Sequence, residues 1–242
     1  SVISNNLANV NTTGFKKDRA VFEDLLYQNI VPAGGQVDAE SETPTGLMLG
    51  TGTRVVATEK LHAQGNIITT ENALDLAISG DGYFSVQQAD GTIAYSRDGS
   101  FKLSADGNLV TAGGQTILPA ITVPQNAASL TIGRDGVVTV ELANGGGSSQ
   151  IGQLQLSRFV NNSGLQPVGR NLMQQTNASG DPLVVLPGAD GAGMLMQGAL
   201  EASNVNVVEE MVNMIETQRA YEVNSKAISA ADGMLRFLNN NL

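Results

Sequence analysis

DLAISGDGYFSVQQADGTIAYSRDGSFKLSADGNLVT, residues 75–111, is the stretch that decides the fold class. Short runs rich in alternating apolar residues are separated here by Asp-Gly pairs, eight or nine residues apart. Glycine readily takes the positive φ of a tight hairpin, and Asp-Gly is a preferred hairpin pair. The spacing predicts an antiparallel β-rich middle domain over residues 53–202, without helices between its strands. The predicted hairpin turns lie at 81–82, 90–91, 98–99, 106–107 and 135–136.

Beyond this domain, apolar residues recur every seven positions, which predicts a long helix within residues 203–242. The stripe consists of Val207, Met214, Tyr221, Ile228, Leu235 and Leu242, with Met211 beside it. Asn206, followed three residues later by Glu209, predicts the helix cap. The stripe is narrow and its flanks are partly polar, which favours packing against other helices over burial in the chain's own core.

The N-terminal residues 1–27 carry a weaker helical pattern. Ile3, Leu7 and Val10 repeat at helical spacing, and Gly14 predicts the end of the helix. The intervening asparagines are poor residues for a helix interior. These are Asn5, Asn6 and Asn9. Contacts with other segments or other subunits are therefore needed to hold this segment, and the fold class expected is α+β, mainly β.

Residues 28–52 differ in composition from both neighbours. Glycine, proline and acidic residues dominate, and too little apolar surface is present for this segment to fold alone. The composition predicts an extended loop that becomes ordered on contact with another surface.

Charge and cysteine content exclude several classes of function. Thirteen lysines and arginines stand against 23 aspartates and glutamates in 242 residues, so the formal net charge of −10 disfavours nucleic-acid binding. Without cysteine there is no disulfide and no zinc-thiolate site. No apolar run approaches the roughly 20 residues of a membrane span, and residues 1–10 do not resemble a secretory signal. The start at Ser1 suggests that upstream residues were removed.

No catalytic, cofactor or metal site is expected. The single histidine, His62, would have to work with Ser79 or Ser85, yet no G-x-S-x-G elbow is present. The Asp-Gly turns do not follow an EF-hand pattern, and the Gly pairs at 50–52 and 191–193 do not complete a dinucleotide-binding loop. The number of aspartates and glutamates alone does not exclude a glycosidase. A secreted β-rich hydrolase or carbohydrate-binding module therefore stays as an alternative.

Two terminal motifs resemble a known family. Residues 5–16, NNLANVNTTGFK, are similar to the N-terminal signature of the bacterial flagellar rod and hook proteins. Residues 203–226, SNVNVVEEMVNMIETQRAYEVNSK, resemble the matching C-terminal signature. The chain length, residues 21–27 and the loop at 28–52 resemble the family members of the distal rod, with proximal rod subunits as the nearest alternative.

The resemblance implies a structural subunit that is not an enzyme and needs no cofactor. Its terminal helices, within 1–27 and 203–242, would pair in a coiled-coil-like inner domain beneath the β-rich domain. Subunits would assemble into a rigid hollow tube that transmits torque from motor to hook in bacterial motility.

The implied partners are further copies, proximal rod and hook subunits, and the surrounding ring proteins, with no nucleic acid and no membrane insertion. The expected location is the periplasm-spanning rod of the basal body, reached by flagellar type III export without a cleaved signal. The expected subunit-interface residues are Ile3, Asn5, Asn6, Leu7, Asn9, Val10, Val207, Met211, Met214, Tyr221, Ile228 and Leu235.

Overall fold

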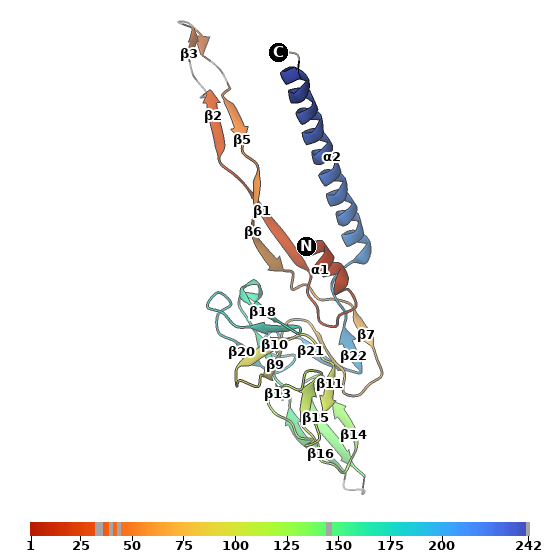
Figure 1. Ribbon diagram of the computed structural model, residues 1–242. Helices are drawn as coiled ribbons and strands as arrows, with labels where there is room; N and C mark the ends of the chain where they lie inside the picture. Colours follow the sequence, from red (N-terminus) through yellow and green to blue (C-terminus); the bar gives the residue numbers. More distant parts are fainter. Residues whose placement is uncertain (32–35, 39–40, 43–44, 144–146, 241–242) are drawn as a thin grey trace. The chain divides into compact units, whose positions relative to one another are not determined.

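A computed structural model describes residues 1–31, 36–38, 41–42, 45–143 and 147–240 of the chain (Figure 1). Strands dominate this part, together with two α-helices and one short 3-10 helix, η1 (Asn162–Gly164). The predicted class, α+β and mainly β, is confirmed.

The chain divides into two compact units. Residues 18–60 form the smaller one, and almost all of residues 1–17 together with 61–242 form the larger. The predicted domain boundaries, at 27/28, 52/53 and 202/203, separate functional regions and not compact units. They stay predictions.

The smaller unit is a ribbon of antiparallel strand pairs. β1 (Asp18–Asp24) pairs with β6 (Thr53–Lys60), β2 (Tyr27–Val31) with β5 (Leu47–Gly50), and β3 (Gln36–Asp38) with β4 (Ser41–Glu42). The predicted loop at 28–52 is therefore largely strand where it is described, while 32–35, 39–40 and 43–44 lie outside the described residues. The backbone hydrogen bonds between paired strands define this ribbon, and composition alone did not reveal them.

Cross-strand ion pairs join β1 to β6. Lys60 Nζ lies 2.8 Å from Asp18 Oδ1, and Arg54 Nη2 lies 3.1 Å from Glu23 Oε2. Opposite charges facing each other across an antiparallel pair stabilise its register.

The larger unit contains a seven-stranded sheet and several smaller ones. In spatial order the main sheet has β11 (Phe101–Leu103), β12 (Leu109–Thr111), β13 (Thr116–Leu118), β9 (Phe84–Gln87), β10 (Ile93–Ser96), β19 (Leu172–Gln174) and β18 (Gln166–Gly169). A second sheet has β14 (Ala127–Ile132), β15 (Val137–Leu142) and β16 (Ser148–Gln153). The remaining pairs are β17 (Leu156–Arg158) with β20 (Leu183–Val185), β8 (Leu76–Ser79) with β21 (Met194–Gln197), and β7 (Ile67–Thr69) with β22 (Ala199–Glu201).

The core of this unit is built from inward-facing strand residues. Phe84 and Phe101 meet edge to face with ring centroids 5.0 Å apart, among buried aliphatic side chains such as Leu76 and Leu156. A second cluster surrounds Tyr95, Tyr83 and Phe159 and packs in the same edge-to-face manner. Burial of these side chains is what supports the sheets from inside.

Three of the five predicted Asp-Gly hairpins are confirmed. The pairs at 90–91, 106–107 and 135–136 join β9 to β10, β11 to β12 and β14 to β15. The pairs at 81–82 and 98–99 do not close hairpins, because β8 pairs with β21 and β11 with β12 instead. Gly99 is needed for a different reason: a Cβ there would collide with the Leu76 carbonyl. Turn chemistry alone does not say which strand pairs with which.

The two α-helices are α1 (Val2–Ala8) and α2 (Val207–Asn240), and α2 is 34 residues long. α1 ends before Gly14, so the prediction that Gly14 stops this helix was wrong. Leu242, the last predicted stripe residue, lies outside the described residues. Neither described helix is long and apolar enough to cross a membrane.

Candidate subunit interface

The start of α2 is capped as predicted. Asn206 Oδ1 accepts hydrogen bonds from the backbone N–H groups of Val208, at 3.0 Å, and Glu209, at 3.4 Å. These bonds satisfy two of the N–H groups that a helix leaves open at its first turn.

The predicted stripe along α2 faces solvent. Tyr221, Ile228 and Leu235 are 76%, 71% and 66% exposed. Val207 and Met211 are exposed and Met214 is half-buried. Burying side chains of this kind yields roughly 1.5–3 kcal/mol each, so an exposed row of them indicates a surface for a partner.

The predicted residues of α1 and the following turn lie in a different environment. Ile3, Leu7, Asn9 and Val10 are half-buried and Asn5 is exposed. Asn9 Nδ2 donates to the carbonyl and the side-chain oxygen of Asn5, at 2.9 and 3.1 Å. This bonding explains how an asparagine-rich segment completes a helical turn despite its low helix propensity.

Asn6 is buried and contacts α2 within the same chain. Its Nδ2 donates to Glu210 Oε2 at 3.3 Å. The structure therefore brings α1 and the first turn of α2 together. The stripe residues from Tyr221 onward are not joined to α1 by any described hydrogen bond or ion pair. The roles of these residues between subunits stay predictions.

A buried ion cluster holds both ends of the chain on the β-rich region. Lys16 Nζ lies 2.6 Å from Glu201 Oε1, and Arg97 Nη1 lies 3.2 Å from Glu201 Oε2. Lys16 follows α1, Arg97 follows β10 and Glu201 ends β22, so three distant segments meet at one carboxylate. Sequence reasoning missed all three residues.

Further hydrogen bonds reach the three buried charged groups. Lys16 Nζ donates to the Ala63 carbonyl at 2.9 Å, and the Gly65 N–H donates to Glu201 Oε1 at 2.9 Å. Arg97 Nη2 donates to the Gly80 carbonyl at 2.8 Å. Burial lowers the pKa of Lys16 below its usual value, and the Glu201 carboxylate offsets part of that shift. A buried charge is tolerated only when it is paired in this way.

A second pair of contacts fixes the first turn of α2. Lys17 Nζ lies 2.7 Å from Glu209 Oε1 and 2.8 Å from Glu210 Oε1. Partial burial lowers the pKa of Lys17, but its hydrogen bonds to the two carboxylates outweigh burial, and the net pKa is raised. The acidic residues also suit the positive end of the helix.

Asn204, just before α2, hydrogen-bonds to the backbone of two other chain segments, at residue 17 and at residues 61–63. Its Oδ1 accepts the Lys17 N–H at 2.7 Å, while its Nδ2 donates to the carbonyls of Leu61 and Ala63, at 2.8 and 3.0 Å. Asn204 is the first asparagine of the C-terminal signature, and its side-chain hydrogen bonds explain the residue type at that position.

Gly14 permits a close approach that no other residue could make. Its φ is +67°, and a Cβ there would lie 2.7 Å from the Asp98 nitrogen. Beside it, Thr13 Oγ1 donates to Asp98 Oδ1 at 3.0 Å, and Asn171 Nδ2 donates to the Thr13 carbonyl at 2.9 Å. The N-terminal signature thus anchors the segment after α1 to the turn that follows β10.

The described residues show no constellation for catalysis. His62 Nδ1 lies 2.8 Å from the Tyr83 hydroxyl, and Ser85 Oγ lies 2.7 Å from Ser157 Oγ, so His62 and Ser85, two of the three candidate triad residues, are joined to other side chains. No group of three His, Cys, Asp or Glu side chains suited to a metal occurs in this part of the chain.

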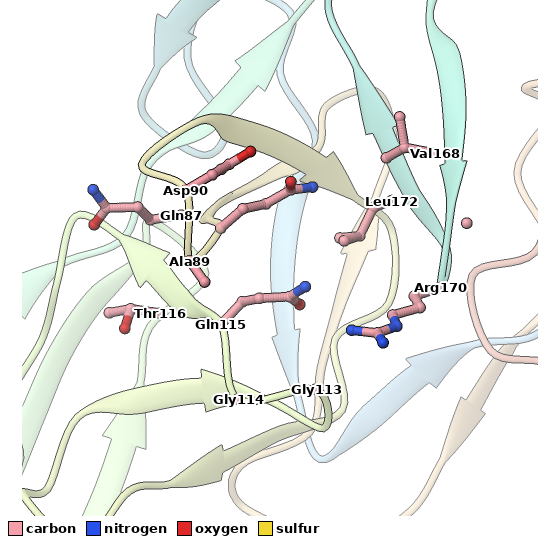
Figure 2. A pocket seen from close by; sticks show the side chains of 12 residues that line it. Gln87, Ala89, Asp90, Gly113, Gly114, Gln115, Thr116, Val168, Arg170 and Leu172 are labelled. Atoms are coloured by element: carbon pink, nitrogen blue, oxygen red, sulfur yellow. The ribbon is translucent and has the colours of Figure 1, made fainter.

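A polar groove of about 710 Å³ lies where three turns of the larger unit meet. Figure 2 shows Gln87, Gln115 and Arg170 among the side chains that line it. Asp90 is the one carboxylic acid among the lining residues, and hydrogen bonds from Thr92, above all from its hydroxyl, lower the pKa of this acid. A lone ionised carboxylate without a facing acid or base offers no acid–base pair.

The chain is similar to known proteins over nearly its whole length. Three family models match the chain: "Flagella basal body rod protein" over residues 1–16, "Flagellar hook protein FlgE/F/G D1 domain" over 77–140, and "Flagellar basal body rod FlgEFG protein C-terminal" over 196–241. The flagellar basal-body rod protein FlgG of Buchnera aphidicola subsp. Acyrthosiphon pisum is 55% identical over 238 residues, which cover 98% of this chain and 92% of that protein.

The chain belongs to the flagellar basal-body rod protein family. FlgG of Agrobacterium fabrum is 46% identical to this rod protein and covers 100% of it, over 92% of its own length. The flagellar hook-basal body complex protein FlhP of Bacillus subtilis is 31% identical over 98% of this rod protein and 91% of its own length. This rod protein is therefore a structural subunit of the flagellar basal body and not an enzyme.

The family signatures now have a physical explanation. Residues 5–16 and 203–226 contain or adjoin the contacts that anchor α1 and α2, while the exposed residues of α2 remain available for contacts outside the subunit. The signal in the sequence was a polar residue next to one apolar neighbour, Lys16 after Phe15 and Asn204 before Val205, which does not by itself reveal a partner.

Proposed function

We propose that this rod protein is the subunit of the distal rod, which polymerises helically into a rigid hollow shaft and carries torque from the motor to the hook. The observation that carries the proposal is the exposed stripe at Tyr221, Ile228 and Leu235, in a chain that belongs to the rod family. An exposed row of apolar side chains is unfavourable in water and favours self-association.

In this proposal the terminal helices pair in an inner domain. The seven-residue spacing of the stripe suits left-handed coiling with neighbouring helices, where each side chain enters a hole between residues of the facing helix. The buried Lys16–Glu201–Arg97 cluster and the Lys17 contacts hold the start of α2 on the β-rich region. Torque applied to the helices would thus reach the β-rich region through short, buried contacts.

The smaller unit would bridge neighbouring subunits and make the shaft resist bending. An isolated two-stranded ribbon is marginal in water, and β1, β2 and β5 expose Phe22, Tyr27 and Leu49. These side chains favour a partner surface for the ribbon. The other partners in this proposal are proximal rod subunits, hook subunits and the surrounding ring proteins, and the route out of the cell is flagellar type III export without a cleaved signal.

The experiment is a localisation combined with a deletion. Antibody labelling of isolated basal bodies should mark the distal part of the rod, and labelling of the proximal part alone would contradict the proposal. Deletion of residues 33–45, most of which lie outside the described residues, should give rods that curve in electron micrographs. Straight rods with normal junctions to their neighbouring structures after the deletion would contradict the bridging role.

A further inference from the structure

α2 changes its apolar side halfway along its length. Residues three or four apart lie on the same side of a helix, so a side can be followed by that spacing. Val208, Met211 and Ile215 form an apolar row near the start of α2, and all three are exposed. We call these three residues the root face. The same side continues as Gln218, Glu222, Lys226 and Ser229, which are polar.

The opposite change occurs on another side of the helix. Glu209, Asn213 and Glu216 follow one another at helical spacing near the start of α2. This side continues as Val223, Ala227, Ala231 and Met234, which we call the tip face. Val223 is 64% exposed and Met234 69%. At about 100° per residue, the root and tip faces point roughly 120° apart around the axis.

Two faces on different sides need two different contacts. A straight partner helix covers one side of α2, and the seam at Tyr221, Ile228 and Leu235 lies on neither the root face nor the tip face. A helix with a single partner would keep its apolar residues on one side throughout. The switch near Ala220 therefore indicates that each half of α2 has a contact in addition to the seam.

Size and charge favour the root face of one copy against the tip face of another. The root face presents the large side chains of Met211 and Ile215, whereas the tip face contains Ala227 and Ala231, which allow a close approach. Large residues facing small ones pack well between helices.

The net charges of the two halves also have opposite signs, although the charged residues lie elsewhere around the helix and not on the two faces. Residues 207–216 carry Glu209, Glu210 and Glu216 and no basic residue, which gives −3. Residues 217–240 carry three basic and two acidic residues, which gives +1: Arg219, Lys226 and Arg236 against Glu222 and Asp232. Lys17 binds two of the acidic residues of the first half and reduces the contrast without reversing it. The two halves of one continuous helix cannot contact each other. A second copy of the chain is therefore the partner that brings the unlike halves together.

We infer that the tip face of α2 in one copy of this chain docks on the root face of α2 in a second copy, a contact that leaves an unused root face and an unused tip face at its two ends. Such a head-to-tail contact propagates instead of closing, and it builds rings or helical filaments. The centres of the two faces are about 17 residues apart, so neighbouring copies would be offset by roughly 25 Å along the helix axis at 1.5 Å per residue. The inference rests on the proposed assembly of the rod and specifies one of its contacts.

Cysteine cross-linking in assembled rods tests the contact, because the chain has no cysteine of its own. The pair Met211→Cys with Ala227→Cys, 16 residues apart and so close to the expected offset, should give a ladder of covalent multimers on mild oxidation of isolated basal bodies. The pair Met211→Cys with Ser229→Cys is the matched control, because Ser229 lies on the polar continuation of the root side. This control should give monomers only.

The outcomes separate the possible contacts. Dimers from Ala227→Cys alone would indicate a closed two-fold contact between tip faces and would overturn the inference. Absence of a ladder in rods that assemble normally would also overturn it, and Ile215→Cys with Ala231→Cys, again 16 residues apart, provides a second pair for this decision. Proximal labelling of the protein would remove the proposed place in the distal rod while leaving a positive ladder, and hence the contact, intact.

Discussion

Lys16 Nζ and Glu201 Oε1 lie 2.6 Å apart, and both side chains are removed from solvent. The two residues are 185 positions apart in the chain, one after α1 and the other shortly before α2. Their contact links the N-terminal signature to β22, which directly precedes the C-terminal signature, and, through Arg97, to the segment that follows β10 of the main sheet. A buried ion pair contributes little net stability but is costly to break on one side.

Removal of the shared carboxylate should be the most damaging single change in this cluster. Glu201→Leu leaves Lys16 and Arg97 buried without their counter-ion, and the free energy of unfolding should fall by about 3–5 kcal/mol in denaturant titrations. Glu59→Gln, which removes the half-buried partner of the exposed Arg19, should cost less than about 1 kcal/mol. The triple variant Lys16→Met, Arg97→Met, Glu201→Leu should recover most of the loss. A Glu201→Leu protein as stable as the control would argue against the cluster.

Gly14→Ala should loosen the segment after α1. The positive φ and the close Asp98 backbone both oppose a Cβ, and a cost of about 1–3 kcal/mol follows. Gly91→Ala is the matched control, because Gly91 has a φ of +82° with nothing within 4 Å of the added Cβ. Hydrogen exchange at residues 10–17 should quicken in the first variant only. Equal effects in both variants would mean that glycine is needed at position 14 because of backbone strain and not because of the close contact with Asp98.

Alkaline pH should destabilise the larger unit through Tyr83. Burial raises the pKa of this phenol to about 12, above its ordinary value of 10.0. The stabilisation is complete below pH 10, where the hydroxyl is neutral in both states, and is lost as pH rises toward 12, because the unfolded chain ionises first. The shift corresponds to roughly 2–3 kcal/mol. Between pH 10 and 12, the free energy of unfolding of Tyr83→Phe should fall less steeply with pH than that of the original protein. An unchanged slope would refute Tyr83 as the cause of the pH dependence.

Charges placed on the exposed stripe should block assembly while the β-rich region stays folded. Tyr221→Asp or Ile228→Asp removes roughly 1.5–3 kcal/mol of apolar burial per contact, which weakens association about 10- to 100-fold. Lys226→Gln, on the polar side of α2, should assemble normally. Sedimentation and cell motility would measure assembly, and circular dichroism the fold. Normal rods from both aspartate variants would show that the stripe is not an interface.

Local patterns in the sequence were sufficient for much of the fold. The β-rich class, three Asp-Gly hairpins, the long helix and its Asn206 cap all follow from interactions between residues close in the chain. Part of the strand ribbon at residues 18–60 was missed, because the composition of residues 28–52 predicts a loop and residues 18–27 were assigned to the helical region 1–27. The pairs at 81–82 and 98–99 were misassigned because strand pairing there is decided by distant strands.

By itself, the sequence determined that the chain has an apolar stripe spaced for helix packing, a β-rich middle and termini that resemble those of a known family. Only the tertiary structure decided what the terminal signatures do inside the subunit. A lysine, an arginine and a glutamate far apart in the chain share one buried site, and Gly14 fits against the Asp98 backbone. Periodicity records which side of an element is apolar, whereas the partner of a buried charge depends on where the whole chain brings distant segments together.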